Sequence, residues 1–264
     1  WLNENLNKVK IIDASWHLVK NRNAIEEYNK EHIENAIFFD LDKSSNQRKN
    51  LPHGHFLPST SDHEKNISEM GILNTDRIII YCYSNLISSC RAWFQFLYFG
   101  HNPKLVSVLN GGMKKWKLEG RKVTNQKTKI IPTKYKATEN INMIKVKSQI
   151  NENIKRKEFT VLDARSKKRF LGLESEPRPG IKSGSIKESK SLPLSEIVNM
   201  KDNTFLNTKK LRDIFNSNSI SSNKIVMSCG SSVSAASLAL AYSLINDDYI
   251  PKIYIGSWTE FGKK

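Results

Sequence analysis

One cysteine, placed between an apolar strand and a helical stretch, has the surroundings that point most directly to chemistry. Residues 224–228, KIVMS, form a short apolar run typical of a buried strand, and Cys229 follows it directly. A small polar loop, 230–232, then leads into an Ala- and Leu-rich helical stretch that begins at Val233. The free N–H groups of such a loop and helix start attract an anion and favour the reactive thiolate. A buried structural cysteine is the alternative, but the Gly-Ser-Ser loop favours chemistry, because small residues let a substrate approach the backbone.

Three segments of the first half of the chain recur in the second half at offsets of about 150 residues. The pairs are IIDAS at 11–15 with VLDAR at 161–165, IIIYC at 78–82 with IVMSC at 225–229, and VLNGGMKKW at 108–116 with IYIGSWTEF at 253–261. Strands that alternate with helices predict a mostly parallel sheet covered on both faces, with the site at the carboxyl ends of the strands. We therefore expect an α/β fold of two tandem domains, each a mostly parallel sheet flanked by helices. Cys82 and Cys229 lie at corresponding strand ends.

The repeat also sets the expected domain boundaries. They are 1–120 for the first domain, 121–142 for a linker over the surface, and 143–264 for the second domain. Apolar runs predict strands at 9–14, 77–81, 105–109, 159–164, 224–228 and 250–255. Residues 31–40 are expected to form a turn followed by a further strand. Helical patterns are expected at 23–31, 62–70, 88–99, 143–157, 205–216 and from Val233 onward, and long loops at 41–60 and 165–190.

The composition limits the classes of partner. The chain has 264 residues, of which 38% are hydrophobic, and a net charge of +16. Such charge invites a nucleic-acid interpretation, but the lysines are scattered and lack interleaved aromatic residues, so we expect no nucleic-acid partner. A basic surface would instead steer anionic small substrates or acidic proteins. The three cysteines lack CxxC and zinc-ligand spacing, which argues for a reducing compartment and against disulfides or a metal.

The sequence also bears on location. The longest apolar stretch, 238–245, is too short to cross a membrane, and no signal peptide is visible. We therefore expect a cytoplasmic protein that does not bind membranes. Because the sequence lacks an initiator Met, a mitochondrial location stays open if a targeting segment precedes residue 1.

Several motifs together resemble those of a known family. They include HIENAIFFDLD, RAWFQFLYFGH, ESEPRPG at 174–180, CGSSVSA and GSWTEF. With them the chain resembles the two-domain rhodanese-like sulfurtransferases over essentially its whole length, and among them those that use 3-mercaptopyruvate. The resemblance implies a non-catalytic first domain that contributes to a cleft, and a catalytic second domain. It implies that Cys229 accepts sulfur as a persulfide, that pyruvate is released, and that a thiol acceptor such as thioredoxin or a small thiol takes the sulfur, without a metal or organic cofactor.

The resemblance assigns a substrate clamp to two arginines. Arg169 in KRF and Arg178 in EPRPG match the family's clamp, and guanidinium groups suit a carboxylate with an adjacent carbonyl. Arginines are usually solvated surface charges, but both precede the cysteine strand on one long loop, which favours the functional interpretation. The loop residues expected to bind the substrate with them are Gly230, Ser232, Val233 and Ser234.

A Ser-His-Asp relay follows from the same resemblance. Ser231, His55 and Asp42 match its positions, and they come from both domains, which implies a site in the interdomain cleft. His53 competes with His55; we choose His55 because it precedes Phe-Leu-Pro at 56–58. Without the resemblance, Asp42 would be a turn residue and His55 a surface histidine.

Two departures from the family pattern bear on activity. Ser232 stands where the family's CGSG loop has glycine, so a positive φ there would strain the loop or reshape it. The second departure is Gly-Ser-Ile at 184–186, where the family usually has Gly-His-Ile.

Other interpretations remain to be weighed. Cys82 is the rival nucleophile, but its loop, 83–89, is longer and bulkier, and Cys90 belongs inside the following helix. A cysteine phosphatase would need an arginine six residues after its nucleophile, where Ala235 and Ser88 stand, so this class is excluded. The alternatives are a thiosulfate sulfurtransferase and a persulfide relay or interaction module with little turnover that serves RNA thiolation.

Overall fold

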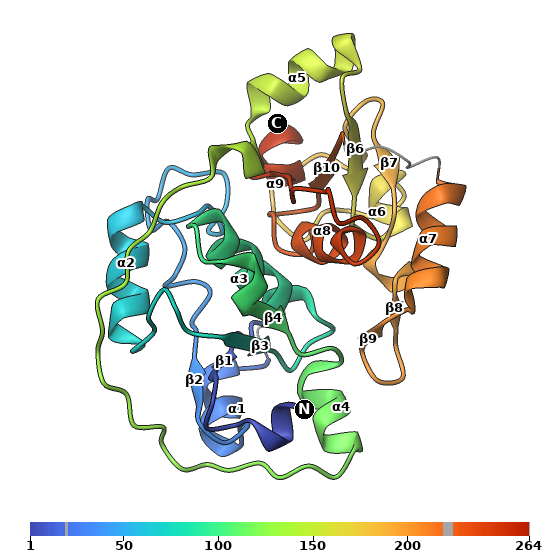
Figure 1. Cartoon of the computed structure of the whole chain (residues 1–264). Helices are drawn as coiled ribbons and strands as arrows, with labels where there is room; N and C mark the ends of the chain where they lie inside the picture. Colours follow the sequence, from blue (N-terminus) through green and yellow to red (C-terminus); the bar gives the residue numbers. More distant parts are fainter. Residues whose placement is uncertain (19–20, 219–223, 264) are drawn as a thin grey trace. The chain divides into compact units, whose positions relative to one another are not determined.

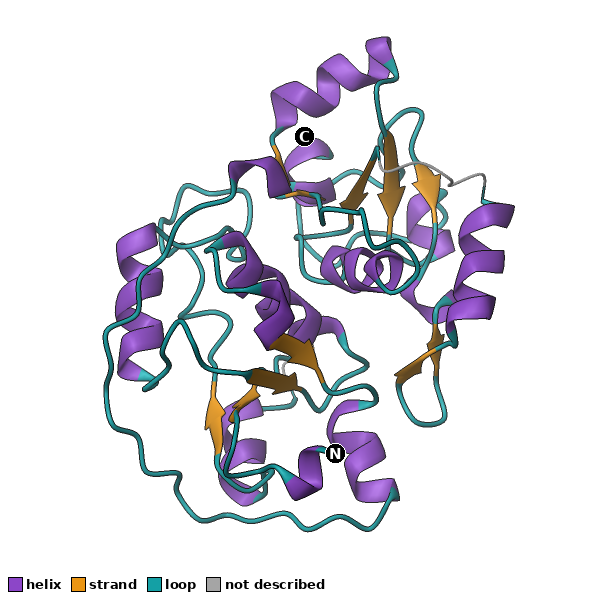
Figure 2. Cartoon of the chain, viewed as in Figure 1, coloured by secondary structure: helices purple, strands orange, loops and turns teal. Residues whose placement is uncertain are grey.

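A computed structural model describes residues 1–18, 21–218 and 224–263. The chain forms two compact units, each with its own parallel sheet and helices (Figures 1 and 2). The first unit contains Trp1–Gln47, Leu57–Asn140 and Met200–Thr204, and the second contains Arg48–Phe56, Ile141–Asn199 and Phe205–Lys264.

Four strands form the sheet of the first unit in the order β2-β1-β3-β4, and all their pairings are parallel. The strands are β1 (Lys10–Asp13), β2 (Ala36–Phe38), β3 (Ile78–Tyr81) and β4 (Val106–Val108). The helices are α1 (Ala24–Lys30), α2 (Thr60–Glu69), α3 (Ile87–Tyr98) and α4 (Gly112–Leu118), with 3-10 turns η1 (Leu2–Glu4) and η2 (Pro103–Leu105). Every residue of β3 is buried, as expected for a parallel strand with both faces covered. Met113 and Trp116 of α4 pack with Ile79 and Tyr81 of β3, while α3 contacts β3 and β4.

The sheet of the second unit has five strands in the order β5-β11-β10-β6-β7, again with parallel pairings. The strands of this part of the chain are β5 (Ile144–Lys145), β6 (Thr160–Asp163), β7 (Lys190–Ser191), β8 (Val198–Asn199), β9 (Thr204–Phe205), β10 (Ile225–Ser228) and β11 (Ile253–Tyr254); β8 and β9 pair apart from the five-stranded sheet. The helices are α5 (Lys147–Arg156), α6 (Lys167–Phe170), α7 (Thr208–Ser217), α8 (Ala235–Ser243) and α9 (Ser257–Phe261), with 3-10 turns η3 (Ile141–Met143) and η4 (Leu194–Glu196).

The core of the second unit explains why the cysteine loop is well supported. Ile150 of α5 and Trp258 of α9 pack with Val161, Val226 and Tyr254 from the three central strands. Helix α8 packs on β10 and β11, and nearly all its residues are buried, which accounts for its apolar sequence. The expected strands at 9–14, 77–81, 159–164 and 224–228 are confirmed, as is the mostly parallel pairing.

Four expectations about elements were wrong. Ile144–Lys145, predicted as the start of a helix, is strand β5, which pairs with β11 in parallel. Helix α6 lies inside the stretch expected to be loop, and the Ser166 side chain caps it by accepting a hydrogen bond from Arg169 N. Helix α7 begins at Thr208, not at residue 205, because the Asn207 side chain caps it there. Helix α8 begins at Ala235, two residues after Val233.

Residues 121–140 of the segment expected to be a linker lie against the first unit without forming a helix or strand (Figure 2). Thr124 exchanges backbone hydrogen bonds with His32 at 2.8 Å, and Thr133 Oγ1 donates to Ile72 O at 2.6 Å. Tyr135 is buried, and its hydroxyl lies 3.0 Å from His101 Nδ1. Within the described residues, no helix has both the length and the apolar character needed to span a membrane.

Candidate active site

Cys229 lies directly after β10, at the carboxyl edge of the second sheet. Ser228 pairs with Asp163 at the end of β6, so the neighbouring strand ends at the same level. The Cys229 side chain is 1% exposed, and residues 230–234 lead from it to the start of α8. The first N–H groups of a helix have no acceptor within the helix, which makes this edge suited to an anion.

Helix α9 holds the cysteine loop from one side. Trp258 N donates to Cys229 O at 2.9 Å, and Gly230 O accepts from Thr259 N at 3.0 Å and from Thr259 Oγ1 at 2.6 Å. Ser257 Oγ accepts the N–H of Ser232 at 2.9 Å, so that N–H is not directed at a substrate. The supporting role of Ser257 and Thr259 was not predicted from the GSWTEF motif. The available signal was a pair of hydroxyl residues on either side of Trp258.

Ser232 stands where the family has glycine, and it adopts the left-handed conformation that glycine favours. Its φ is 60°, and the residue is fully buried. The Ser232 hydroxyl donates to His55 O at 3.3 Å, which gives the side chain a partner in this position. Val233 is buried after it, and Ser234 precedes α8 without a side-chain capping bond.

The Ser231 hydroxyl connects an arginine with a histidine. Arg178 Nη2 donates to Ser231 Oγ at 3.1 Å, and His55 Nδ1 lies 3.0 Å from the same oxygen. Since Arg178 can only donate, the Ser231 O–H is free to donate to His55 Nδ1 when that nitrogen is unprotonated. The segment Arg48–Phe56 belongs to the second unit, which is how His55 comes to Ser231.

His53, the rival of His55, has both ring nitrogens engaged with the backbone. Its Nε2 lies 3.0 Å from Ile255 O, and its Nδ1 accepts the His55 N–H at 3.0 Å. This pattern fixes the tautomer that carries the proton on Nε2. His53 therefore holds the segment in place, and His55 has the better geometry for a proton relay.

Asp42, the third member of the predicted relay, belongs to the first unit. Both its carboxylate oxygens lie 3.1 Å from Trp16 Nε1, which donates to them. Its backbone O accepts from Gln47 Nε2 at 2.6 Å. These contacts orient the carboxylate within its own unit.

The two arginines predicted as a clamp converge on Gly230. A Cβ placed on Gly230 would lie 3.2 Å from Arg169 Nη2 and 3.7 Å from Arg178 Nη1, so the absence of a side chain leaves room for both guanidinium groups. Burial lowers the pKa of Arg178; the negative charge of a Cys229 thiolate raises it, and repulsion from Arg169 lowers it further. The arginine nevertheless stays protonated at neutral pH, because its ordinary pKa is so high.

The other two cysteines have structural surroundings. Cys82 Sγ donates to Ser84 O and contacts Ser89 Oγ, both at 3.3 Å, and buried Leu86 occupies its loop. Cys90 is buried within α3. All three cysteines are free thiols. Among the residues that the structure describes, no three His, Cys, Asp or Glu side chains lie together as a metal site would require.

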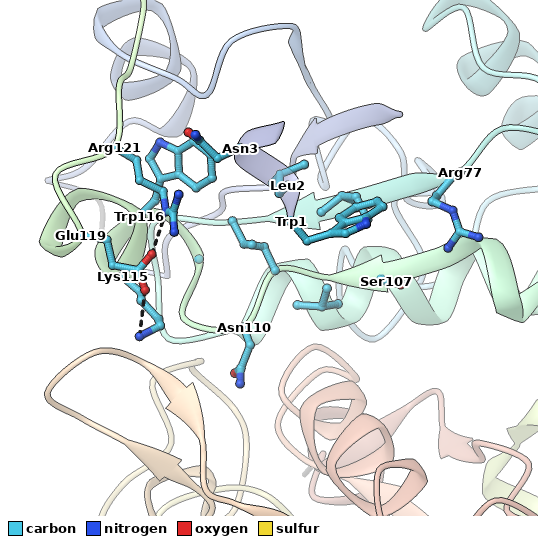
Figure 3. A pocket seen from close by; sticks show the side chains of 14 residues that line it. Trp1, Leu2, Asn3, Arg77, Ser107, Asn110, Lys115, Trp116, Glu119 and Arg121 are labelled. Carbon is cyan, nitrogen blue, oxygen red and sulfur yellow. Dashed lines mark hydrogen bonds and ion pairs between the residues drawn. The ribbon is translucent and has the colours of Figure 1, made fainter. Parts of the chain in front are cut away.

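A separate cavity of about 450 Å³ lies in the first unit beside β4 (Figure 3). Lys115 and Arg121 both pair with Glu119 at its rim, at 3.1 and 2.7 Å. None of the predicted site residues lines this cavity.

Comparison with known proteins places this chain in a family. The rhodanese-like domain family matches residues 1–119. A thiosulfate/3-mercaptopyruvate sulfurtransferase from Arabidopsis thaliana mitochondria is 34% identical over 99% of this chain and 74% of its own length. The chain belongs to the rhodanese-type sulfurtransferases. The family, fold class and kind of activity expected from the sequence are thereby confirmed.

Further relatives agree with this membership. Human 3-mercaptopyruvate sulfurtransferase is 32% identical over 96% of this chain and 84% of its own length. The crystal structure of SseA from Escherichia coli, a 3-mercaptopyruvate sulfotransferase, superposes with a TM-score of 0.86 at 29% identity, covering 98% of this chain and 96% of SseA. As a sulfurtransferase, this protein moves sulfur from a donor to a thiol acceptor.

Proposed function

We propose that this sulfurtransferase takes sulfur from 3-mercaptopyruvate through a persulfide on Cys229. The observation that carries the proposal is the convergence of Arg169 and Arg178 over Gly230, next to the cysteine. The loop after Cys229 contributes no cationic side chain, so both positive charges come from long arginines, Arg169 of α6 and Arg178 of the segment that follows this helix. Such paired guanidinium groups suit a planar α-keto carboxylate.

The chemistry follows from these positions. The Cys229 thiolate attacks the donor sulfur, a new S–S bond forms, and the C–S bond breaks with its electron pair leaving on the enolate of pyruvate. The proton of the donor thiol is released towards the relay of Ser231, His55 and Asp42, and the enolate carbon takes up a proton. In the second half-reaction an acceptor thiolate attacks the outer sulfur and regenerates the Cys229 thiolate.

The remaining loop residues have supporting roles in this proposal. Gly230 leaves room for the clamp, and Ser232, Val233 and Ser234 shape the turn into α8. Thioredoxin or a small thiol would accept the sulfur, in the cytoplasm or in mitochondria. The internal repeat supports a division into an N-terminal domain 1–120, a linker 121–142 and a catalytic domain 143–264.

Thiosulfate is the second candidate donor, because the name of the Arabidopsis relative includes both donors. Pyruvate release from 3-mercaptopyruvate with dithiothreitol, measured beside sulfite release from thiosulfate, separates the two. Release of pyruvate that disappears in Cys229→Ser supports the proposal. Faster turnover of thiosulfate would favour the second candidate. No turnover of either donor would point to the relay module, and turnover that survives in Cys229→Ser would point to Cys82.

A further inference from the structure

A buried carboxylate, that of Glu176, contacts the arginine clamp. Glu176 Oε1 accepts hydrogen bonds from Arg165 Nη1 at 2.6 Å and from Arg169 Nε at 3.2 Å. Glu176 Oε2 accepts from Arg169 Nη2 at 2.5 Å. The Glu176 side chain is 2% exposed, so solvent screens these ion pairs only weakly.

Arg165 has a second carboxylate of its own. Its Nε and Nη2 donate to Asp163 in a bidentate pair, and its guanidinium carbon lies 4.7 Å from the ring centroid of Trp258. Trp258 N in turn donates to Cys229 O. Because Asp163 pairs with Arg165, Glu176 can pair with Arg169. These charged residues lie near the cysteine loop at two points. One is Arg169 beside Gly230, and the other is Arg165 beside Trp258.

Apart from the Cys229 thiolate, the cluster leaves one net positive charge at the clamp. Arg165, Arg169 and Arg178 supply three positive charges, and Asp163 and Glu176 supply two negative ones. The hydrogen bond of Arg178 goes to the neutral Ser231 hydroxyl. Mercaptopyruvate with its thiol protonated is a monoanion, whereas thiosulfate is a dianion.

We propose that Glu176 determines donor specificity by charge. By pairing with Arg169, whose Nη2 lies over Gly230, Glu176 holds the clamp at a charge that suits a monoanionic carboxylate. Without the Glu176 charge, a dianion gains more than a monoanion from the added positive charge. This inference rests on the proposed function of the clamp, and it makes Glu176 a positioning residue, because it acts through Arg169.

Steady-state kinetics of Glu176→Gln with both donors test the proposal. We expect the ratio of kcat/KM for thiosulfate to that for mercaptopyruvate to rise on the order of tenfold over wild type. Glu174→Gln is the matched control: it makes the same change in charge on the same loop, but Glu174 is exposed and its carboxylate accepts from the neutral Ser166 hydroxyl at 3.2 Å. Glu176→Asp retains the charge, so its ratio should stay within about twofold of wild type even if both rates fall.

An unchanged ratio in Glu176→Gln, an equal shift in Glu174→Gln, or a comparable shift in Glu176→Asp would each overturn the proposal. If Glu176→Gln does not fold, Glu176→Asp tests the proposal alone, and a ratio that differs from wild type by more than about twofold would overturn it. Protection of Cys229 from iodoacetamide by sulfate and by pyruvate gives a readout that needs no turnover, and sulfate should gain over pyruvate in Glu176→Gln. Absence of turnover in wild type would contradict the proposed function, whereas normal turnover with an unchanged ratio would contradict this inference alone.

Discussion

Ser232 shows how a single backbone angle is accommodated in the cysteine loop. A non-glycine residue in the left-handed region costs about 1–2 kcal/mol, and Ser232 has a φ of 60°. The contact of its hydroxyl with His55 O and the hydrogen bond of its N–H with Ser257 offset part of that cost. Of these two bonds, only the one from the hydroxyl depends on the serine side chain.

The first prediction concerns this position. We expect Ser232→Gly to change the free energy of unfolding by less than about 1 kcal/mol, since relief of strain is offset by the lost hydrogen bond and by the flexibility of glycine in the unfolded chain. Ser232→Val should destabilise by roughly 2 kcal/mol or more, because a β-branched residue fits this conformation poorly. Urea unfolding of the two variants measures the difference. Equal stability of the two would show that the angle is not restrictive.

Ser231 carries the second prediction, which concerns proton transfer. We expect Ser231→Ala to lower kcat for mercaptopyruvate about tenfold to a hundredfold, since the pyruvate enolate needs a proton and the relay loses its first member. Turnover of thiosulfate should fall much less, because sulfite leaves without protonation at carbon. Ser243→Ala, on α8, where the Ser243 hydroxyl donates to Ala239 O, is the control for the same change in size. Equal losses with both donors would argue against a relay and for a role in binding.

At the scale of elements, the internal repeat places an aspartate at the end of β1 in the first unit and at the end of β6 in the second. Asp163 at the end of β6 pairs with Arg165. Asp13 at the end of β1 is followed by Ser15 instead, whose N–H donates to Asp13 at 2.9 Å. Burial raises the pKa of Asp13 to about 6, although hydrogen bonds from Ser15 and the charge of His32 act in the opposite direction. The difference between Arg165 and Ser15 at corresponding positions therefore decides whether the buried carboxylate has an arginine partner.

The third prediction follows from that raised pKa. The folded protein binds the Asp13 proton more tightly than the unfolded chain, so this contribution to stability is present at low pH and is lost as the pH rises through about 6. We expect the stability of Asp13→Asn relative to wild type to increase by roughly 3 kcal/mol between about pH 4 and pH 7. Urea unfolding across this range measures it. A difference that is independent of pH would contradict the assignment.

Asp163→Asn provides the matched comparison for the same substitution in the other unit. It should destabilise the protein at neutral pH, because it leaves Arg165 with one carboxylate instead of two. Opposite signs for the two aspartates would confirm that the partner, and not the strand end itself, sets the effect.

Much of this architecture could be predicted from the sequence because the central strands are continuous apolar runs. Residues 78–81 and 225–228 are buried throughout, which leaves a clear signal. Strand β5 has two residues and α6 has four, and elements that short show no period. Their existence depends on pairing with β11 and on the cap at Ser166, which a sequence pattern does not reveal.

A candidate site could be proposed where a residue type is itself reactive, as for Cys229. The family motifs singled out the two clamp arginines, whereas Glu176 resembles any solvated charge until its two arginine partners are located. The His53 ring meets the backbone oxygen of Ile255 and the His55 ring meets the Ser231 hydroxyl, and both contacts span about 200 residues of sequence. Such long-range contacts leave no local trace.

At the scale of the whole molecule, the net charge of +16 and the anionic donors belong together. A strongly basic protein attracts anions over distances comparable to the Debye length, which shrinks from about 30 Å at 0.01 M salt to about 3 Å at 1 M. The local clamp can then act on a donor concentration that the overall field has already raised. We therefore expect the net positive charge to contribute to capture of the anionic donor.

The last prediction tests this long-range effect. We expect kcat/KM for mercaptopyruvate to fall about tenfold between about 0.02 M and 0.5 M salt, mainly because association slows. Alkylation of Cys229 by neutral iodoacetamide should change little over the same range, whereas alkylation by anionic iodoacetate should slow with the donor reaction. Cys229→Ser gives the background from Cys82 and Cys90, both of which are buried. If the neutral reagent slowed as much as the anionic one, salt would be altering the site itself, and the net charge would have no part in capturing the donor.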